Sequence, residues 1–481
     1  MKRRIYTIPI VLSLCLLNLS CKKNWLEAKP QKALVVPKKI SDYQALLDNT
    51  LTSNSIGFND AYNTLGEIGA GDFYVLDTFL KLRPFEEKVY KWIPDIYADQ
   101  TNLTEWSNPY KRIFYTNVVL EGIDQIIPSN GNEQIAWHQV KGTAFFFRAV
   151  YHYTVAQSYC KPYQAGGSNA DLGIPLRLTS NFNEPTTRSK VQETYQQIVT
   201  DLKQAASLLP VDKPTDTLYR LRPTKVAATG MLARVYLSMG EYDSAFVYAD
   251  KSLQTYSTLL DYNSTTTGSP TGTQINIAPT TTASFARFNV EVIFHLTGSS
   301  WTYFLQSRLY VDSLLYKSYN VNDNRRLAFF KVPSGTPLPN TYTFRGSYDN
   351  SNQILFTGIS TNELYLTRAE CYARKGNIAS AVNDLVYLLT RRYKPNTLGQ
   401  ILPPTADDAL KLILGERRKE LCFRSIRWSD LRRLNLEPQF QVTLQRVTSG
   451  QTYTLPPNSN LYVLPIPPDI IQLTSIQQNP R

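Results

Sequence analysis

The chain has 481 residues, of which 42% are hydrophobic and 19% are charged, a composition that is typical of globular proteins and excludes a disordered chain. This length allows a large core in one or two domains. The formal net charge of +12 is a mild bias for such a length, and basic residues cluster only in residues 416–433, so we expect no nucleic-acid partner.

The first 20 residues have the pattern of an export signal. Lys2, Arg3 and Arg4 precede an apolar run over residues 5–19. The run has the length of a signal-peptide core and is shorter than the roughly 20 residues that a helix needs to span a bilayer. We therefore predict a signal peptide over residues 1–20, with an uncut N-terminal membrane anchor as the alternative.

A cysteine directly follows this signal. Leu19, Ser20 and Cys21 resemble the lipobox of bacterial lipoproteins, in which the cysteine becomes the acylated N-terminus. Asn18 departs from the apolar residue that this pattern prefers, and Cys15 follows a bulky leucine and is a poorer site. We therefore predict lipidation at Cys21, because several acyl chains on one residue hold a protein stably on a membrane.

The remaining cysteines are Cys160, Cys371 and Cys422, each in an apolar, helix-like context. Because their number is odd, we expect buried free thiols and no disulfide framework. The three histidines have no paired spacing, so we expect no metal site, and no motif indicates a cofactor.

Long helical patterns follow in chain order. Residues 133–160 predict a long helix that is apolar on much of its surface and therefore mostly buried. Residues 189–209 predict an amphipathic helix with apolar positions 4, 3, 4, 3 and 4 residues apart, and Pro210 ends it. Between the two helices, the Gly- and Pro-containing residues 161–180 predict a loop.

An internal repeat occurs at an offset of 136 residues, between residues 233–253 and 369–389. A small residue, a tyrosine three positions later, a turn glycine and a later alanine have the spacing of a tetratricopeptide unit, a pair of antiparallel helices. Because the two units are not contiguous, we expect helix pairs with large insertions instead of a regular solenoid. The matched positions are Ala233 and Ala369, Tyr236 and Tyr372, Gly240 and Gly376, and Ser244-Ala245 and Ser380-Ala381.

Irregular segments surround the second unit. Residues 263–284 are rich in Thr, Ser and Gly and predict an exposed loop. Residues 289–297 predict a strand, with Val290, Val292 and Phe294 alternating. The proline-rich tail over residues 461–481 predicts extended chain with at most a short turn of helix.

Several motifs, in their usual order, resemble those of the SusD/RagB family of nutrient-uptake lipoproteins of the Bacteroidota outer membrane. Two positions depart from the family's pattern: Arg424-Ser425 stands where Glu-Gly is usual, and Asp469 stands where Glu is usual. The resembling segments are residues 25–49, 108–123, 142–163, 361–392, 416–435 with the sequence ERRKELCFRSIRWSDLRRLN, and 464–480 with the sequence LPIPPDIIQLTSIQQNP.

The resemblance implies a mainly α fold in which tetratricopeptide-type helix pairs form a superhelical scaffold with large loop insertions and a few short strands. It implies an N-terminal region over residues 21–260 and a C-terminal region over residues 261–481, packed as one unit. The family's members are lipid-anchored at the outer membrane and face outward. They catch glycans, or peptides in some members, and pass them to a SusC-like TonB-dependent transporter.

No catalysis is implied by the resemblance, and the chain has no motif of a serine hydrolase, zinc protease or nucleotide-binding enzyme. A glycosidase would need two carboxylates flanking the sugar bond, which sequence alone does not place. Two further alternatives stay open: a peptide-binding member of the family, and a tetratricopeptide scaffold that binds only protein partners.

The dense charges of residues 416–433 allow two interpretations, an anion site or a helix held by ion pairs such as Glu416–Lys419, with Phe423 and Trp428 facing the core. We favour the ion-paired helix.

Tyr, Phe and Trp make up 12% of the chain, and their flat faces suit sugar rings, although most are expected to pack helices together. Two poorly helical segments combine such rings with polar side chains, whereas Trp106 has helical spacing from Tyr110 and is expected in the core. The candidate ligand contacts are Asp72, Tyr74 and Trp92 in the first segment, and Trp301 and Tyr303 in the second.

Overall fold

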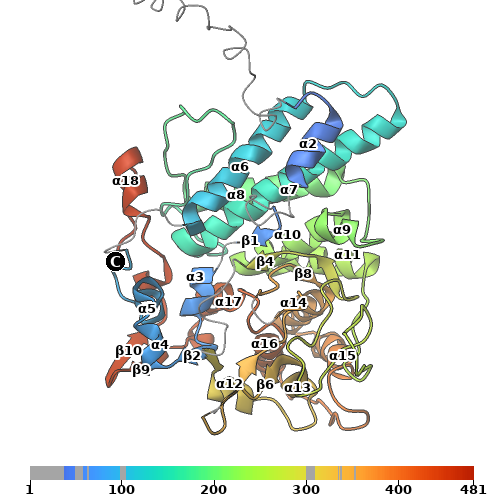
Figure 1. Ribbon diagram of the computed structural model, residues 1–481, viewed down its shortest axis with the longest axis vertical. Coiled ribbons are helices and arrows are strands. Elements are labelled where there is room, and N and C mark those ends of the chain that lie inside the picture. Colours follow the sequence, from blue (N-terminus) through green and yellow to red (C-terminus); the bar gives the residue numbers. More distant parts are fainter. Residues whose placement is uncertain are drawn as a thin grey trace, which may run out of the picture. The chain divides into compact units, whose positions relative to one another are not determined.

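Three long helices within residues 104–208 form an antiparallel layer in the computed structural model, which describes residues 37–48, 58–61, 64–97, 104–298, 309–333, 335, 338–351 and 354–481 (Figure 1). Helix α7 (Gly131–Tyr159) lies between α6 (Thr104–Ile123) and α8 (Val191–Leu208), and α2 (Ile40–Leu47) packs on α6 and α7. The Asn130 side chain accepts a hydrogen bond from the backbone N–H of Glu133 at 3.0 Å and caps α7. From Gln139 onward, α7 is buried on nearly every face, as its sequence predicts.

The two repeat units form helix pairs, as predicted. The first pair is α10 (Lys225–Met239) and α11 (Tyr242–Thr255), and the second is α14 (Thr361–Arg374) and α15 (Ile378–Leu389). The turn glycines adopt left-handed conformations, with φ of 75° at Gly240 and 77° at Gly376, which a glycine tolerates without strain. Although residues 256–360 separate the pairs in sequence, α11 packs directly on α14, so the pairs are neighbours in space (Figure 1).

Two further helices close the scaffold. Helix α16 (Ala406–Glu420) packs on α14 and α15, and α17 (Arg427–Leu434) packs on α10 and on the short helix α3 (Thr64–Gly69). The turn between α16 and α17 has positive φ at two non-glycine residues, 59° at Phe423 and 56° at Ser425. This conformation costs energy for residues with a Cβ.

Strands are short in the described part of the chain and pair two by two. A three-residue strand forms within residues 289–297, as predicted, but all three of its residues are buried. It therefore does not show the alternation of buried and exposed side chains on which the prediction was based. The hairpin near the C-terminus was not predicted. The pairs are β1 (Asp60–Ala61) with β4 (Thr297–Gly298), β2 (Phe73–Val75) with β5 (Leu309–Val311), β3 (Val292–Phe294) with β8 (Ile359–Ser360), β6 (Phe330–Lys331) with β7 (Thr343–Phe344), and β9 (Leu444–Thr448) with β10 (Gln451–Leu455).

The remaining elements are single turns or short helices. The predicted turn of helix in the proline-rich tail is α18 (Pro468–Thr474), and residues 263–284 contain no helix and no named strand, as expected. The others are α4 (Asp77–Leu80), α5 (Pro84–Tyr90), α9 (Leu218–Leu221), α12 (Ser313–Lys317), α13 (Arg325–Phe329) and the 3-10 turns Pro438–Phe440 and Asn460–Tyr462.

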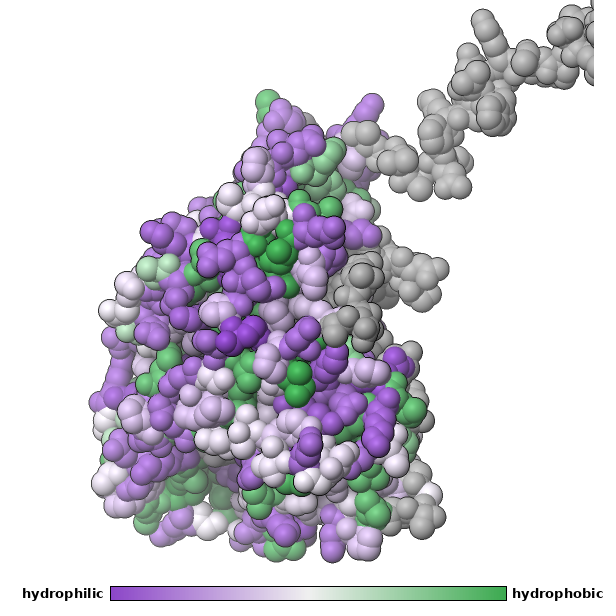
Figure 2. Space-filling view, turned by 90° about the vertical axis from the view of Figure 1, so that its left-hand side faces the viewer, coloured by the Kyte–Doolittle hydropathy of each residue, from purple (hydrophilic) through white to green (hydrophobic). Residues whose placement is uncertain are grey.

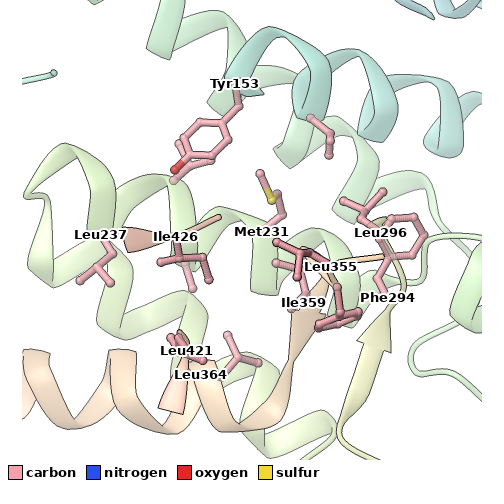
Figure 3. Packing of buried hydrophobic residues seen from close by; sticks show 14 of the residues in the cluster. Tyr153, Met231, Leu237, Phe294, Leu296, Leu355, Ile359, Leu364, Leu421 and Ile426 are labelled. Atoms are coloured by element: carbon pink, nitrogen blue, oxygen red, sulfur yellow. The ribbon is translucent and has the colours of Figure 1, made fainter. Parts of the chain in front are cut away.

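One large hydrophobic core runs through the helical layers. At its centre, Tyr153 points from α7 toward Leu237 of α10 and Ile426 (Figure 3). The three cysteines of the described chain, Cys160, Cys371 and Cys422, are buried and free, as predicted. Residues 40–481 form one compact unit.

The N-terminal predictions lie outside the described residues. These are the signal peptide and the lipidation site Cys21. Within the described part of the chain, no helix is both long enough and apolar enough to cross a membrane.

Candidate ligand-binding site

Two short strand pairs join the chain on either side of residues 299–308 to residues 60–75. The pairing of β1 with β4 ends at Gly298, and the antiparallel pairing of β2 with β5 begins at Leu309. The two residues that flank the stretch 299–308, which carries the candidates Trp301 and Tyr303, are therefore paired with Ala61 and Val75. Trp301 and Tyr303 themselves lie outside the described residues.

Tyr74 lies in β2 directly opposite Tyr310 of β5. Their rings stack with centroids 5.4 Å apart and planes inclined by 24°, and the side chain of Tyr74 is half-buried. Partial burial, followed by the neighbouring Tyr310 and Asp312, raises the pKa of Tyr74, so its phenol stays neutral and can donate a hydrogen bond. Among the described candidates, Tyr74 is the one whose side chain reaches the surface.

Asp72 precedes β2 and is completely buried. One carboxylate oxygen, Oδ1, accepts from Arg418 of α16, at 3.0 Å from Nε and 2.9 Å from Nη2. The backbone carbonyl of Asp72 also accepts from the N–H of Asp312 at 2.9 Å. Asp72 therefore has a structural role, because its hydrogen bonds fix β2 against α16 and the start of α12.

Trp92 is also an interior residue, with 6% of its surface exposed. Its indole Nε1–H donates to the carbonyl of Gly69 at 3.1 Å, and the guanidinium of Arg446 lies 4.6 Å from the ring centroid. The ring packs in a second apolar cluster together with Ala70, Trp428, Leu431, Leu455 and Tyr462. Trp92 thus holds α3 against the C-terminal hairpin.

A buried carboxyl group lies beneath this region. Glu67 of α3 has no exposed surface, and its Oε2 accepts from the backbone N–H of Ser425 at 2.8 Å. Burial, reinforced by the charge of Asp72, raises the pKa of Glu67 to about 8, whereas the Ser425 hydrogen bond and Arg427 lower it by less. Glu67 is therefore protonated at neutral pH, which avoids a second negative charge next to Asp72.

A separate open cleft of about 260 Å³ lies between α6, the loop over residues 175–186 and α18. Phe182 at the loop tip is 79% exposed, and Phe114 on α6 is also exposed. The side of the molecule on which α18 lies shows small apolar patches among polar residues (Figure 2). The cleft is lined by Trp106, Tyr110, Phe114, Pro175, Arg177, Thr179, Ser180, Asn181, Phe182, Thr186, Ile470 and Thr474.

The loop that carries Phe182 is anchored to α6. Asn117 of α6 donates to the carbonyls of Arg177 at 3.0 Å and Thr179 at 2.9 Å. Glu121, one turn further along α6, accepts from the N–H of Ser180 at 2.7 Å. These bonds fix the backbone of residues 177–180, which precedes Phe182.

Sequence reasoning missed this cleft. The exposed phenylalanine between two asparagines, Asn181 and Asn183, was the available signal, because an apolar ring in a polar loop is unusual. Trp106 is buried, as expected, with its ring 4.9 Å from that of Tyr159, and it forms part of the floor of the cleft.

The dense charges of residues 416–433 form ion pairs, as favoured from the sequence. Arg325 of α13 binds Glu416 at 2.7 Å and Glu420 at 3.1 Å, and Lys419 also pairs with Glu416. Trp428 and Phe423 are buried, as predicted. Within the described ranges, no group of three or more His, Cys, Asp or Glu side chains is arranged to hold a metal ion.

Family models match two long parts of the chain. Residues 24–237 match the model described as "Starch-binding associating with outer membrane", and residues 360–481 match the model of the SusD family. No curated protein matches the chain.

Solved structures share the fold over nearly the whole chain. A SusD superfamily protein from Bacteroides thetaiotaomicron is 21% identical, with a TM-score of 0.70 and coverage of 92% of this chain and 100% of that one. A SusD-like carbohydrate-binding protein from Bacteroides vulgatus is 19% identical, with a TM-score of 0.64 and coverage of 91% and 97%. A laminarin-binding SusD-like protein is 16% identical, with a TM-score of 0.61 and coverage of 92% and 100%. With its two matched regions and this mainly α fold, the chain belongs to the SusD/RagB family.

Proposed function

We propose that this protein is a lipid-anchored binder on the outward face of the outer membrane, which captures glycans and delivers them to a SusC-like TonB-dependent transporter. The family model that matches the N-terminal half is described as starch-binding and outer-membrane-associated, and one structural neighbour binds laminarin. The protein binds its ligand without catalysing a reaction.

The pairing of β2 with β5 is the observation that carries this proposal. It sets the stacked Tyr74–Tyr310 pair next to Leu309, at one end of the stretch that contains Trp301 and Tyr303. A sugar is bound by flat apolar faces against its C–H groups and by polar edges at its hydroxyls. We propose Tyr74, Trp301 and Tyr303 as direct contacts, with Asp72 and Trp92 acting from below by fixing β2 and α3.

Calorimetric titration tests the binding function. The chain without residues 1–21 is titrated with plant, host and microbial glycans and with mixed oligopeptides. We expect saturable binding to one glycan class, weakened about two- to tenfold by Tyr74→Ala and by Trp301→Ala, because a stacked ring contributes about 0.5–1.5 kcal/mol. Tyr387→Ala is a matched control, since Tyr387 is a partly exposed tyrosine on helix α15 and not in β2.

One outcome contradicts the glycan proposal, and another contradicts the proposed site. Binding of peptides alone assigns the protein to peptide uptake. Glycan binding that survives both Tyr74→Ala and Trp301→Ala, but is lost in Phe182→Ala, moves the site to the cleft beside α6.

The anchor and the partner are tested separately. Cys21→Ala is expected to release the protein from the membrane fraction, and retention with an uncut signal contradicts the lipoprotein assignment. Co-purification of a TonB-dependent transporter with the wild-type protein from outer membranes tests the delivery role.

A further inference from the structure

A small interior cavity of about 40 Å³ lies where α7, α10 and the turn between α16 and α17 meet. Tyr153, Leu237, Met231 and Ile426 surround this place in the core (Figure 3). Nearly all the residues that line the cavity are buried. Since a cavity needs roughly 10–15 Å³ of such space for one water molecule, this one holds a small ion or a few waters.

The lining of the cavity is strongly basic for a protein interior. Four guanidinium groups line it, and Asp430 is its one carboxylate. Both oxygens of Asp430 are engaged, Oδ1 with Arg433 at 2.8 Å and Oδ2 with Arg417 at 2.9 Å. Arg433 is also bound by Glu370 at 2.6 Å, and the third guanidinium, that of Arg234, is held by Glu363 at 2.6 Å. Three carboxylates therefore offset the charges of these three guanidinium groups.

The fourth guanidinium, that of Arg424, has no such partner. Its side chain is 5% exposed, and among the described residues no carboxylate lies within 4.0 Å of it. Its Nη1 donates to the hydroxyl of Ser360 at 2.8 Å, and the ring of Tyr348 lies 4.0 Å from its central carbon. Its Nη2 donates to no protein group.

More distant charges do not replace a direct partner. Glu291 and Glu420 act on Arg424 from beyond ion-pair distance. Both are already bound by Arg392, at 2.6 Å and 2.8 Å, and Glu420 is also bound by Arg325. A buried cation is costly unless it is both paired and hydrogen-bonded.

We propose that this cavity is a binding site for a small inorganic monoanion of the size of chloride, held by Arg424 Nη2, the free donor of the one lining guanidinium that has no carboxylate partner among the described residues. A water molecule would satisfy the free N–H but not the charge. An anion satisfies both, so it is the favoured occupant.

Thermal unfolding of the mature protein in detergent tests the proposal. The melting temperature is measured in sodium chloride and in sodium gluconate at equal ionic strength. We expect chloride to raise it by about 2–4 °C in a saturable manner. Arg424→Glu removes this chloride dependence by supplying the carboxylate, and the control Arg391→Gln, which changes a guanidinium in the turn that follows α15, retains it.

A second measurement keeps the proposal testable if Arg424→Glu does not fold. Crystals of the wild-type protein grown in sodium bromide are expected to show an anomalous peak within hydrogen-bond distance of Arg424 Nη2. Equal melting temperatures in chloride and gluconate, or a cavity without an anomalous peak, overturn the proposal and assign the space to water.

Discussion

Arg234 of α10 and Glu363 of α14 form a bidentate ion pair across the two repeat units, with Nε to Oε1 at 2.8 Å and Nη2 to Oε2 at 2.6 Å. The two residues are 129 positions apart. Arg234 also donates to the carbonyls of Thr357 at 2.9 Å and Gly358 at 2.6 Å, so it fixes the chain that enters α14. The pair therefore sets how the second helix pair stacks on the first.

Removing Glu363 should be strongly destabilising. Glu363→Ala leaves the guanidinium of Arg234 in the interior without its partner, and we expect a loss of about 3–5 kcal/mol in the free energy of unfolding, measured by urea denaturation. Asp243→Ala removes the exposed partner of Lys375 and should cost less than about 1 kcal/mol. A similar loss in both variants would show that the buried pair has no special role.

Replacing Ser425 by glycine should stabilise the protein. Its φ of 56° costs energy for a residue with a Cβ, so Ser425→Gly should raise the free energy of unfolding by about 0.5–1 kcal/mol. The hydrogen bond from its N–H to Glu67 is made by the backbone and persists. Ser207→Gly within α8 should have the opposite sign, and equal signs would contradict the strain argument.

Glu67 should make the protein less stable as the pH rises. Between its ordinary pKa of 4.5 and its folded value of about 8, the unfolded chain is ionised while the folded one keeps the proton. The stability present below pH 4.5 is therefore lost at about 1.4 kcal/mol per pH unit up to about pH 8. Glu67→Gln should flatten this part of the profile, and urea denaturation at pH 5, 6.5 and 8 measures it. Parallel profiles for the two proteins would contradict a protonated Glu67.

The buried cysteines should resist thiol reagents. Burial raises the pKa of Cys160 to about 11 and that of Cys371 to about 12, and it also raises that of Cys422. Because the thiolate is the reactive form, the chain without residues 1–21 should react with Ellman's reagent only after denaturation, then at three sites. Prompt reaction of one thiol in the native protein would indicate an opening of the core.

The stability of the loop over residues 175–186 should depend on Asn117 and not on Phe182. Phe182→Ala removes a largely exposed ring and should change the free energy of unfolding by less than about 0.5 kcal/mol. Asn117→Ala leaves two partly buried loop carbonyls without their donor and should cost about 1–2 kcal/mol. Hydrogen exchange of residues 177–184 would show whether the loop loosens in Asn117→Ala.

The helix pairs, the buried thiols and the ion-paired segment could be predicted because each is encoded locally. The spacing from Tyr236 to Gly240 already specifies a helix and its turn, and the same spacing recurs from Tyr372 to Gly376. Helix periodicity and charge spacing need only a few neighbouring residues to be interpreted.

The surroundings of Asp72 and Trp92 could not be predicted in this way. A segment that contains both acidic and aromatic side chains looks the same in the sequence whether these side chains bind a sugar or pack in the interior. The hairpin that covers this region lies far along the chain: Arg446 donates to the carbonyl of Tyr90, 356 positions away. The cleft escaped prediction for the same reason, since it is assembled from three distant segments.

The two short ladders at β4 and β5 have a consequence for how this protein can diversify. Gly298 and Leu309, which flank residues 299–308, are held by main-chain pairing to β1 and β2, and main-chain bonds do not depend on side-chain identity. Under the proposed function, mutations, insertions and deletions between these two points would alter ligand recognition while the strand pairs and the helical scaffold stay intact. Stability and ligand specificity would then reside in different parts of the chain, so a related protein could change its ligand without a change of fold.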